Sequence, residues 1–258
     1  MAAEPASLPL LPLTTLCRLI STSEITSTML LEAFLARCAA LNPSLNAVII
    51  IDEEAARERA KLADIATRQG VSWGPLHGIP ITVKENCHVA TLDCTIGDPS
   101  LSQQPSVSSE PVVACLIAAG AIIYGKTNLP VAAADWQSYN PVYGSTNNPF
   151  NLSLTPGGSS GGSAAALAAC LTPFEIGGDI GGSIRIPASF CSLFGHKPTY
   201  GLLAKPGLPG NELDLSVRGP FARCAGDLKA IMEICTTLNG RAKGFVPVLE
   251  PSEKVSEG

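Results

Sequence analysis

Two glycine-rich turns and one lysine contain the residues of this sequence whose types and spacing could do chemistry. The first turn contains Ser159 and Ser160 between pairs of glycines, and the second places Ser183 directly after Gly181 and Gly182. Glycine permits main-chain conformations that other residues avoid and lets a substrate approach closely. Successive N–H groups of such a turn can point into one concavity and stabilise the oxyanion of an acyl-transfer reaction. The pattern therefore indicates a serine nucleophile.

The sequence does not supply the usual base for such a nucleophile. Histidine held by a carboxylate is the common arrangement, but no GxSxG segment accompanies His77, His88 or His196. We expect His77 and His196 to be structural, hydrogen-bonding residues. Lys84 follows an apolar segment at 79–83, where loss of water would lower its pKa and leave a neutral amine. Lys84 is therefore the candidate base, although an isolated lysine is usually a solvated surface residue.

The glycine-rich segments have two other interpretations. A Gly-Ser stretch is most often a flexible linker, but here it leads into residues 164–170, a run of small side chains predicted to be a buried helix. A phosphate-binding loop would need the lysine of GxxxxGK[ST], which is absent, or a GxGxxG segment after a first strand. Both interpretations are weaker than a catalytic turn.

The composition is that of a compact, globular protein. The 258 residues are 46% hydrophobic and 15% charged, which argues against a disordered or collagen-like chain. The net charge is −5 with no basic run, so nucleic acid is not expected as a partner.

The cysteines and the N-terminus indicate in which cellular compartment the protein is expected. The nine cysteines are odd in number and form no CxxC pair, so we expect reduced thiols and no metal site. The N-terminus lacks the positive charge of a secretory signal, and no apolar run reaches the roughly 18 residues of a membrane span. A cytoplasmic protein without a membrane span is the expectation.

Alternating helix and strand patterns predict an α/β fold. We expect helices at 26–41, 53–68, 111–119, 164–170 and 227–238, and strands at 46–51, 79–83 and 121–124. The first helix should stop at Asn42 and Pro43. Residues 140–163 are predicted to be a loop, and residues 177–189 a second glycine-rich turn.

Three segments of the chain resemble the amidase signature family and occur in the family's order. They are GIPITVKEN from Gly78 to Asn86, TPGGSSGGSAAALAA from Thr155 to Ala169, and GGDIGGSIRIPASFCSLFGHKPTYG from Gly177 to Gly201. The phrases LNAVI, AIIYGKTN, YGSTNNPFN and GPFARCAGDL also fit, so the resemblance spans about residues 14–239. It implies one amidase-like domain over residues 1–258 with an irregular tail at about 241–258. The implied fold is a mixed β-sheet flanked by helices on both faces.

The resemblance also implies the roles of individual residues. Lys84 would be the base, Ser159 the bridging serine after a cis peptide bond, and Ser183 the acylated nucleophile of a Ser-Ser-Lys triad. The oxyanion hole would consist of the N–H groups of Ile180, Gly181, Gly182 and Ser183. Ser160 would support the site by hydrogen bonding, and Asp179 and Arg185 would orient the turn. For these last two residues, a purely structural ion pair is an equal alternative to substrate binding.

The implied reaction is hydrolysis of a carboxamide C–N bond to a carboxylate and ammonia or an amine, through an acyl-serine intermediate. It needs no metal or organic cofactor, and the expected partner is a small-molecule amide, with a homodimer left open. Members of this family usually have a longer catalytic domain, so we expect the fold to lack its C-terminal part and the pocket to lack a wall. Two alternatives stay open: a truncated or non-catalytic amidase-like scaffold or binding protein, and an amidotransferase subunit.

Overall fold

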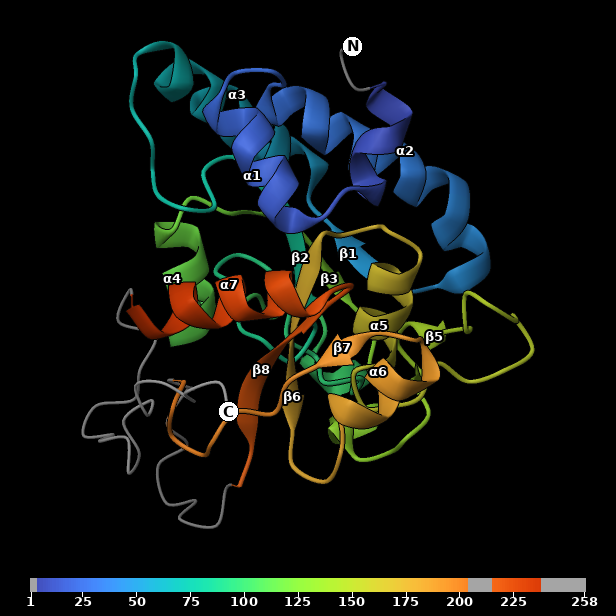
Figure 1. Cartoon of the computed structure of the whole chain (residues 1–258). Coiled ribbons are helices and arrows are strands. Elements are labelled where there is room, and N and C mark those ends of the chain that lie inside the picture. Colours follow the sequence, from blue (N-terminus) through green and yellow to red (C-terminus); the bar gives the residue numbers. More distant parts are fainter. Residues whose placement is uncertain (1–3, 204–214, 238–258) are drawn as a thin grey trace, which may run out of the picture.

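The computed structural model describes residues 4–203 and 215–237, with strands at the centre and helices around them (Figure 1). The helical elements are η1 (Pro5–Leu10), α1 (Leu13–Ser21), α2 (Ser27–Leu45), α3 (Glu53–Arg68), η2 (Pro99–Leu101), α4 (Pro111–Ala118), η3 (Val131–Ala133), α5 (Gly161–Ala168), α6 (Arg185–Phe190) and α7 (Ala225–Thr237). The strands are β1 (Val48–Ile51), β2 (Pro80–Lys84), β3 (Ile122–Thr127), β4 (Tyr139–Asn140), β5 (Gly144–Ser145), β6 (Phe174–Asp179), β7 (Phe194–Gly195) and β8 (Val217–Ala222).

Six of the eight described strands form two three-stranded sheets that lie side by side, and β4 pairs with β5 in a separate two-stranded sheet. In the first, β3 pairs parallel with β2 and antiparallel with β1; in the second, β8 lies antiparallel between β6 and β7. β2 packs beside β6, and the Thr82 N–H donates to Thr172 Oγ1 across this junction at 3.2 Å. Both strand directions are therefore present, which confirms the predicted α/β fold with a mixed sheet.

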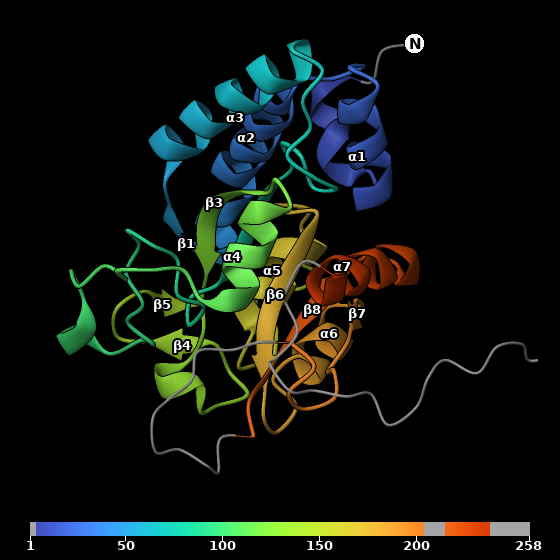
Figure 2. The same ribbon diagram turned by 90° about the vertical axis from the view of Figure 1, so that its left-hand side faces the viewer.

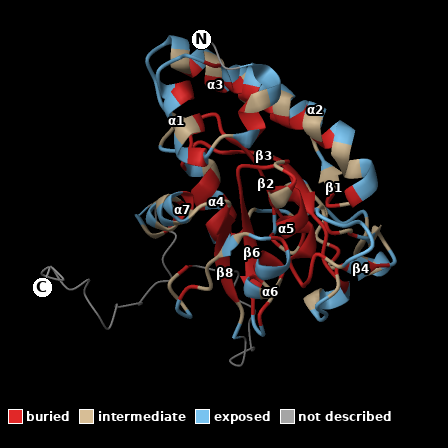
Figure 3. Ribbon diagram, turned by 45° about the vertical axis from the view of Figure 1, so that its right-hand side comes forward, coloured by how far each residue is buried: buried red, intermediate tan, exposed pale blue. Residues whose placement is uncertain are grey.

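Helices cover both sides of these strands, as predicted. On one side, Ala165 and Ala166 of α5 share a buried cluster with Val48 of β1. On the other, Leu116 of α4 and Ile231 of α7 share a cluster with strands β2 and β6. Helices α1, α2 and α3 lie together above the strands in Figures 1 and 2. Burial is concentrated in β2, β6, β8 and α5 (Figure 3), which are the elements nearest the candidate site.

Helix α5 approaches a neighbouring main chain as closely as its small side chains predict. The Gly162 N–H donates to the Asn128 carbonyl at 3.1 Å. A Cβ added at Gly162 would lie only 2.2 Å from the Asn128 nitrogen. Only glycine fits at this position, and the contact fixes the start of α5, just after Ser159 and Ser160.

The prediction that the first helix stops at Asn42 and Pro43 was wrong, because α2 continues to Leu45. Proline lacks one main-chain donor, but Pro43 lies in the last turn, where little helix remains to be disrupted. The helix instead ends at Asn46, which adopts a left-handed conformation with φ of 49°. Asn42 is itself helical, and its side-chain oxygen accepts from the N–H groups of Ala47 and Val48, just beyond the helix, at 2.9 Å each.

The segment 177–189, predicted as one turn, divides into three parts. Gly177 and Gly178 continue β6 because they pair in register with β8, opposite Gly219 and Arg218. Residues 180–184 form the turn itself, and α6 begins at Arg185. Beyond these, the sequence patterns did not predict helices α1 and α6 or strands β4, β5, β6, β7 and β8. The predicted irregular tail lies outside the described residues, as does the end of the last predicted helix.

The sequence predicted neither a membrane-spanning helix nor a metal site, and the described part of the chain can be searched for both. Within residues 4–203 and 215–237, no helix combines the length and apolar character that crossing a membrane requires. The same residues contain no cluster of three or more histidine, cysteine or acidic side chains able to hold a metal ion. None of the nine cysteines, all of which lie in the described ranges, is in a disulfide.

Candidate active site

Lys84 and Ser159 are in direct contact inside the protein. Lys84 is the last residue of β2, and Ser159 precedes α5. The lysine Nζ donates to Ser159 Oγ at 2.7 Å, and both residues are 1% exposed. The peptide bond between Gly158 and Ser159 is cis, as the resemblance implied. Residues 75 positions apart in the sequence thus form a buried amine–hydroxyl pair.

Burial lowers the pKa of Lys84 from an ordinary 10.5 to about 7, and the positive charge of Arg218 contributes to that shift. Cys87, Asp179 and Glu85 oppose the shift. A substantial fraction of Lys84 is therefore a neutral amine at neutral pH. A neutral amine can accept a proton, which an ammonium cannot.

Asp179 organises the turn that carries Ser183. Its carboxylate accepts from the Gly182 N–H at 2.9 Å and from the Ile184 N–H at 3.0 Å. Arg185 closes the arrangement with two hydrogen bonds to Asp179, of 3.0 and 2.9 Å. Burial alone would raise the pKa of Asp179, but the hydrogen bonds from Arg185, Ile184 and Gly182 outweigh it and lower the pKa to about 2. The aspartate is therefore ionised and holds the turn from within.

Ser183 is linked to Ser160 through the main chain. The Ser160 N–H donates to the Ser183 carbonyl at 3.2 Å, which joins the two glycine-rich turns. The Ser160 hydroxyl, by contrast, is buried with no hydrogen-bond partner among the described residues. The support expected from Ser160 thus comes from its main chain. No hydrogen bond joins the hydroxyls of Ser159 and Ser183 within the described part of the chain.

Four N–H groups were predicted to form the oxyanion hole, and they fall into two classes. The Gly182 N–H is already engaged by Asp179. Those of Ile180, Gly181 and Ser183 donate to none of the described residues. Gly182 has a φ of 115°, a conformation that favours glycine and turns the chain so that its N–H faces Asp179. Among the described residues, three of these four N–H groups therefore have no hydrogen-bond partner.

An open cavity of about 490 Å³ lies over Ser183. Ile180 and Gly181 line it together with the segment from Ala132 to Trp136. Ser183 is half-buried, whereas Ile180 is 63% exposed. Ser183 is accordingly reachable from solvent, while the Lys84–Ser159 pair is not.

Comparison with known proteins identifies the family. The family model described as Amidase matches residues 29–258. The chain belongs to the amidase family. Among its curated relatives is a glutamyl-tRNA(Gln) amidotransferase subunit from Roseiflexus sp. (strain RS-1). The two are 41% identical over 211 residues, which cover 82% of this chain and 43% of that protein.

Solved amidase-family structures share the fold. A fatty acid amide hydrolase matches with a TM-score of 0.87 and 30% identity, covering 93% of this chain and 43% of the other. The native peptide amidase of Stenotrophomonas maltophilia matches with a TM-score of 0.80 and 35% identity, covering 86% of this chain and 47% of the other. The chain thus spans less than half the length of these relatives.

Several buried polar residues around the site were not predicted from the sequence. Arg218 of β8 pairs with Glu110, which precedes α4. Glu175 of β6 accepts from the Thr82 hydroxyl, and burial raises its pKa to about 8. No sequence pattern marks Arg218 or Glu110, because each is a single charged residue with no motif around it. Glu175 gives only a weak signal, since it is an acidic residue between the apolar Phe174 and Ile176.

The histidines have structural partners, as expected for His77. Its Nε2 lies 2.9 Å from Thr67 Oγ1, and its Nδ1 accepts from the Trp73 N–H at 3.0 Å. His88 contacts Ser106 Oγ at 3.0 Å. The main-chain N–H of His196 donates to the Pro220 carbonyl. None of these contacts involves Ser159 or Ser183, so the amidase site depends on lysine as its candidate base.

Proposed function

We propose that this protein hydrolyses the C–N bond of a carboxamide through an acyl-enzyme on Ser183, with Lys84 and Ser159 transferring the proton. The observation that carries the proposal is the 2.7 Å contact between Lys84 Nζ and Ser159 Oγ in a site where burial lowers the pKa of the lysine to about 7. Membership of the amidase family supports the same reaction.

In the first half-reaction, neutral Lys84 takes the hydroxyl proton of Ser159 as Ser159 takes that of Ser183. The Ser183 oxygen attacks the amide carbonyl, and the N–H groups of Ile180, Gly181 and Ser183 stabilise the oxyanion. When the C–N bond breaks, the proton returns through Ser159 to the departing nitrogen. The products of this step are an ester on Ser183 and ammonia or an amine.

In the second half-reaction, water loses a proton to the same relay and attacks the ester. Collapse of the second oxyanion releases the carboxylate and returns the proton to Ser183. Asp179 keeps the turn in place throughout, because its carboxylate holds the main chain on both sides of Ser183. Arg185 is half-exposed and completes this support.

Labelling with a fluorophosphonate, followed by peptide mapping, tests the proposal. We expect the label on Ser183 in the folded wild type and none in Ser183→Ala, whereas Ser189→Ala, at an exposed serine on α6, should label normally. Absence of label from a wild type shown by circular dichroism to be folded would overturn the proposal in favour of a non-catalytic scaffold.

A second candidate function is that of an amidotransferase subunit, favoured by the 41% identity to the glutamyl-tRNA(Gln) amidotransferase protein of Roseiflexus. Ammonia release from glutamine, measured against release from simple aliphatic and aryl amides, separates the two. Turnover of glutamine alone would favour the amidotransferase role. A cytoplasmic location is part of the proposal, because an odd number of cysteines without a CxxC pair is typical of reduced thiols in that compartment.

A further inference from the structure

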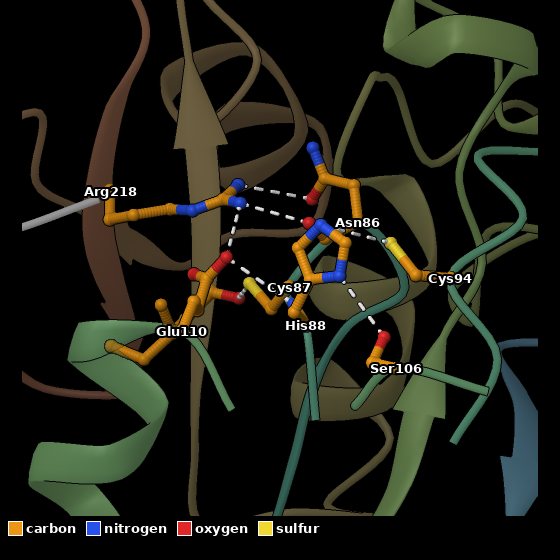
Figure 4. A network of polar contacts seen from close by, with 8 residues as sticks. Asn86, Cys87, His88, Cys94, Ser106, Glu110 and Arg218 are labelled. Carbon is orange, nitrogen blue, oxygen red and sulfur yellow. Dashed lines mark hydrogen bonds and ion pairs between the residues drawn. The ribbon is translucent and has the colours of Figure 1, made fainter. Parts of the chain in front are cut away.

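A buried ion pair lies close to the chain that follows Lys84 (Figure 4). Arg218 Nη2 lies 2.8 Å from Glu110 Oε2, and the two side chains are 7% and 0% exposed. The same guanidinium nitrogen donates to the Asn86 carbonyl at 2.9 Å, and Nη1 donates to Asn86 Oδ1 at 3.2 Å. Glu110 in turn accepts from the His88 N–H at 3.3 Å. The pair thus binds the chain immediately after Lys84.

Arg218 reaches Asn86 because β6 leaves room for it. Arg218 pairs in register with Gly178 of β6, and a Cβ at Gly178 would lie 2.9 Å from Arg218 Nη1. The guanidinium therefore passes over β6 to the end of β2, where Lys84 is the last residue. The three strands that meet here carry Lys84, the turn of Ser183 and Arg218.

Stability alone is a poor reason for this pair. Glu110 Oε1 and Arg218 Nε are buried without a hydrogen-bond partner in the described ranges. A buried ion pair with unsatisfied atoms is often no more stabilising than apolar residues of similar volume. A role in the local electrostatics explains the pair better.

The charged groups around Lys84 show what that role is. Glu85 and Cys87 follow Lys84 on its own chain, Asp179 comes from β6 and Arg218 from β8. Burial raises the pKa of Cys87, so this thiol carries no charge at neutral pH. Arg185 compensates the charge of Asp179. Arg218 is therefore the cation that acts on Lys84, against the opposing charge of Glu85, and Glu110 reduces its effect.

We propose that Arg218 is a positioning residue of the amidase site: it fixes the chain after Lys84 and places a buried positive charge that disfavours the ammonium form of the lysine. Glu110 limits the strength of that charge. The inference rests on the proposed function, in which neutral Lys84 is the base. It concerns a residue outside the two glycine-rich turns.

The test compares Arg218→Gln with Glu110→Gln, because the two variants should act in opposite directions. Two midpoints are measured against pH: the NMR titration of [13Cε]lysine-labelled protein, with the Lys84 signal assigned by its loss in Lys84→Met, and the rate of Ser183 labelling by a fluorophosphonate. We expect Arg218→Gln to raise both midpoints by about one pH unit. Glu110→Gln should lower both, and Arg218→Lys should restore most of the wild-type value.

Arg68→Gln, an exposed arginine at the end of α3, is the matched control and should leave both midpoints unchanged. A purely structural role would shift neither midpoint or would shift both variants in the same direction, and either result overturns the inference. If Arg218→Gln does not fold, the downward shift expected of Glu110→Gln decides the question. If the wild type does not label, the proposed function fails, whereas the NMR titration still decides whether Arg218 acts on Lys84.

Discussion

Lys84 Nζ and Ser159 Oγ lie 2.7 Å apart in a region closed to solvent. The amine comes from the end of β2 and the hydroxyl from the turn before α5, so the contact depends on packing between the two. Burial makes Lys84 a candidate base because it lowers the pKa of the amine, and the same burial lowers the free energy of unfolding of the protein. Activity and stability should therefore respond to changes at this pair in different ways.

Ser159 and Ser160 offer a matched pair of substitutions. Ser159→Ala removes the hydroxyl that contacts Lys84 and should slow Ser183 labelling by about 100-fold or more, as for loss of a proton-transfer group. Ser160→Ala removes a buried hydroxyl with no partner among the described residues, while its main-chain N–H still holds Ser183. This variant should keep most of the labelling rate. Equal losses in the two variants, at equal thermal stability, would contradict the assignment of Ser159.

The rate of Ser183 labelling should rise with pH. Lys84 must be neutral to accept a proton, and its pKa is lowered to about 7 by burial and by Arg218. The rate is therefore expected to increase through neutral pH and to level off above about pH 8, measured by timed labelling of folded protein. A flat profile through neutral and alkaline pH is the result that would exclude lysine as the base.

The same lysine should make stability depend on pH. The pKa of Lys84 falls from 10.5 when unfolded to about 7 when folded, so the unfolded state binds the extra proton between these values. The cost of burying Lys84 is absent above pH 10.5, where the lysine is neutral in both states, and it grows as the pH falls to about 7. The total is about 5 kcal/mol at most.

Urea titrations of wild type and Lys84→Met between neutral pH and pH 10.5 measure this effect. We expect Lys84→Met to be more stable near neutral pH, because wild-type Lys84 must release a proton on folding and methionine has none to release, and the difference between the proteins to shrink as the pH rises. Glu175 contributes to both proteins and so cancels from the difference. A difference that does not change with pH would show that the pKa of Lys84 is not lowered.

Local patterns in the sequence predict the parts of the site that depend on neighbouring residues. The position of Lys84 after an apolar strand was predicted, because hydrophobic runs and turn residues are local signals. The close approach of α5 was predicted for the same reason, from its small side chains. The triad roles came from the resemblance to a family, and no local pattern would have assigned them.

The remaining features depend on contacts that no local pattern encodes. The capture of the Gly182 N–H by Asp179 follows from the φ of Gly182 and from how the turn closes. Arg218 meets Asn86 over 132 positions of sequence, through space left by Gly178. Helix α2 continues through Pro43 to Leu45, and the left-handed conformation of Asn46 then ends it. These are tertiary effects, and only the assembled fold shows them.

Asp179 and Arg185 should differ in importance although they form one ion pair. The Asp179 side chain is 0% exposed and holds the main chain at Gly182 and Ile184, whereas that of Arg185 is 53% exposed. Asp179→Asn leaves a buried, mismatched amide and should cost about 3 kcal/mol of stability, together with most of the Ser183 labelling. Arg185→Gln should cost at most about 1 kcal/mol. Thermal unfolding and Ser183 labelling of both variants check this. Larger losses in Arg185→Gln than in Asp179→Asn would make Arg185 the residue that orients the turn.

Glycine at position 162 should be indispensable to the contact between α5 and the chain at Asn128. In Gly162→Ala, the new methyl group would lie 2.2 Å from the Asn128 nitrogen and 2.6 Å from its oxygen, so one main chain must move. Overpacking of this kind typically costs about 1–3 kcal/mol. Because Ser159 lies shortly before the contact, labelling of Ser183 should fall as well.

Gly226→Ala is the matched control, since that glycine also lies in a helix but has no atom within 4 Å of the added Cβ. This variant should be neutral or up to about 1 kcal/mol more stable. Urea unfolding of the two variants decides the matter: similar stabilities would mean that α5 does not need its close approach to Asn128.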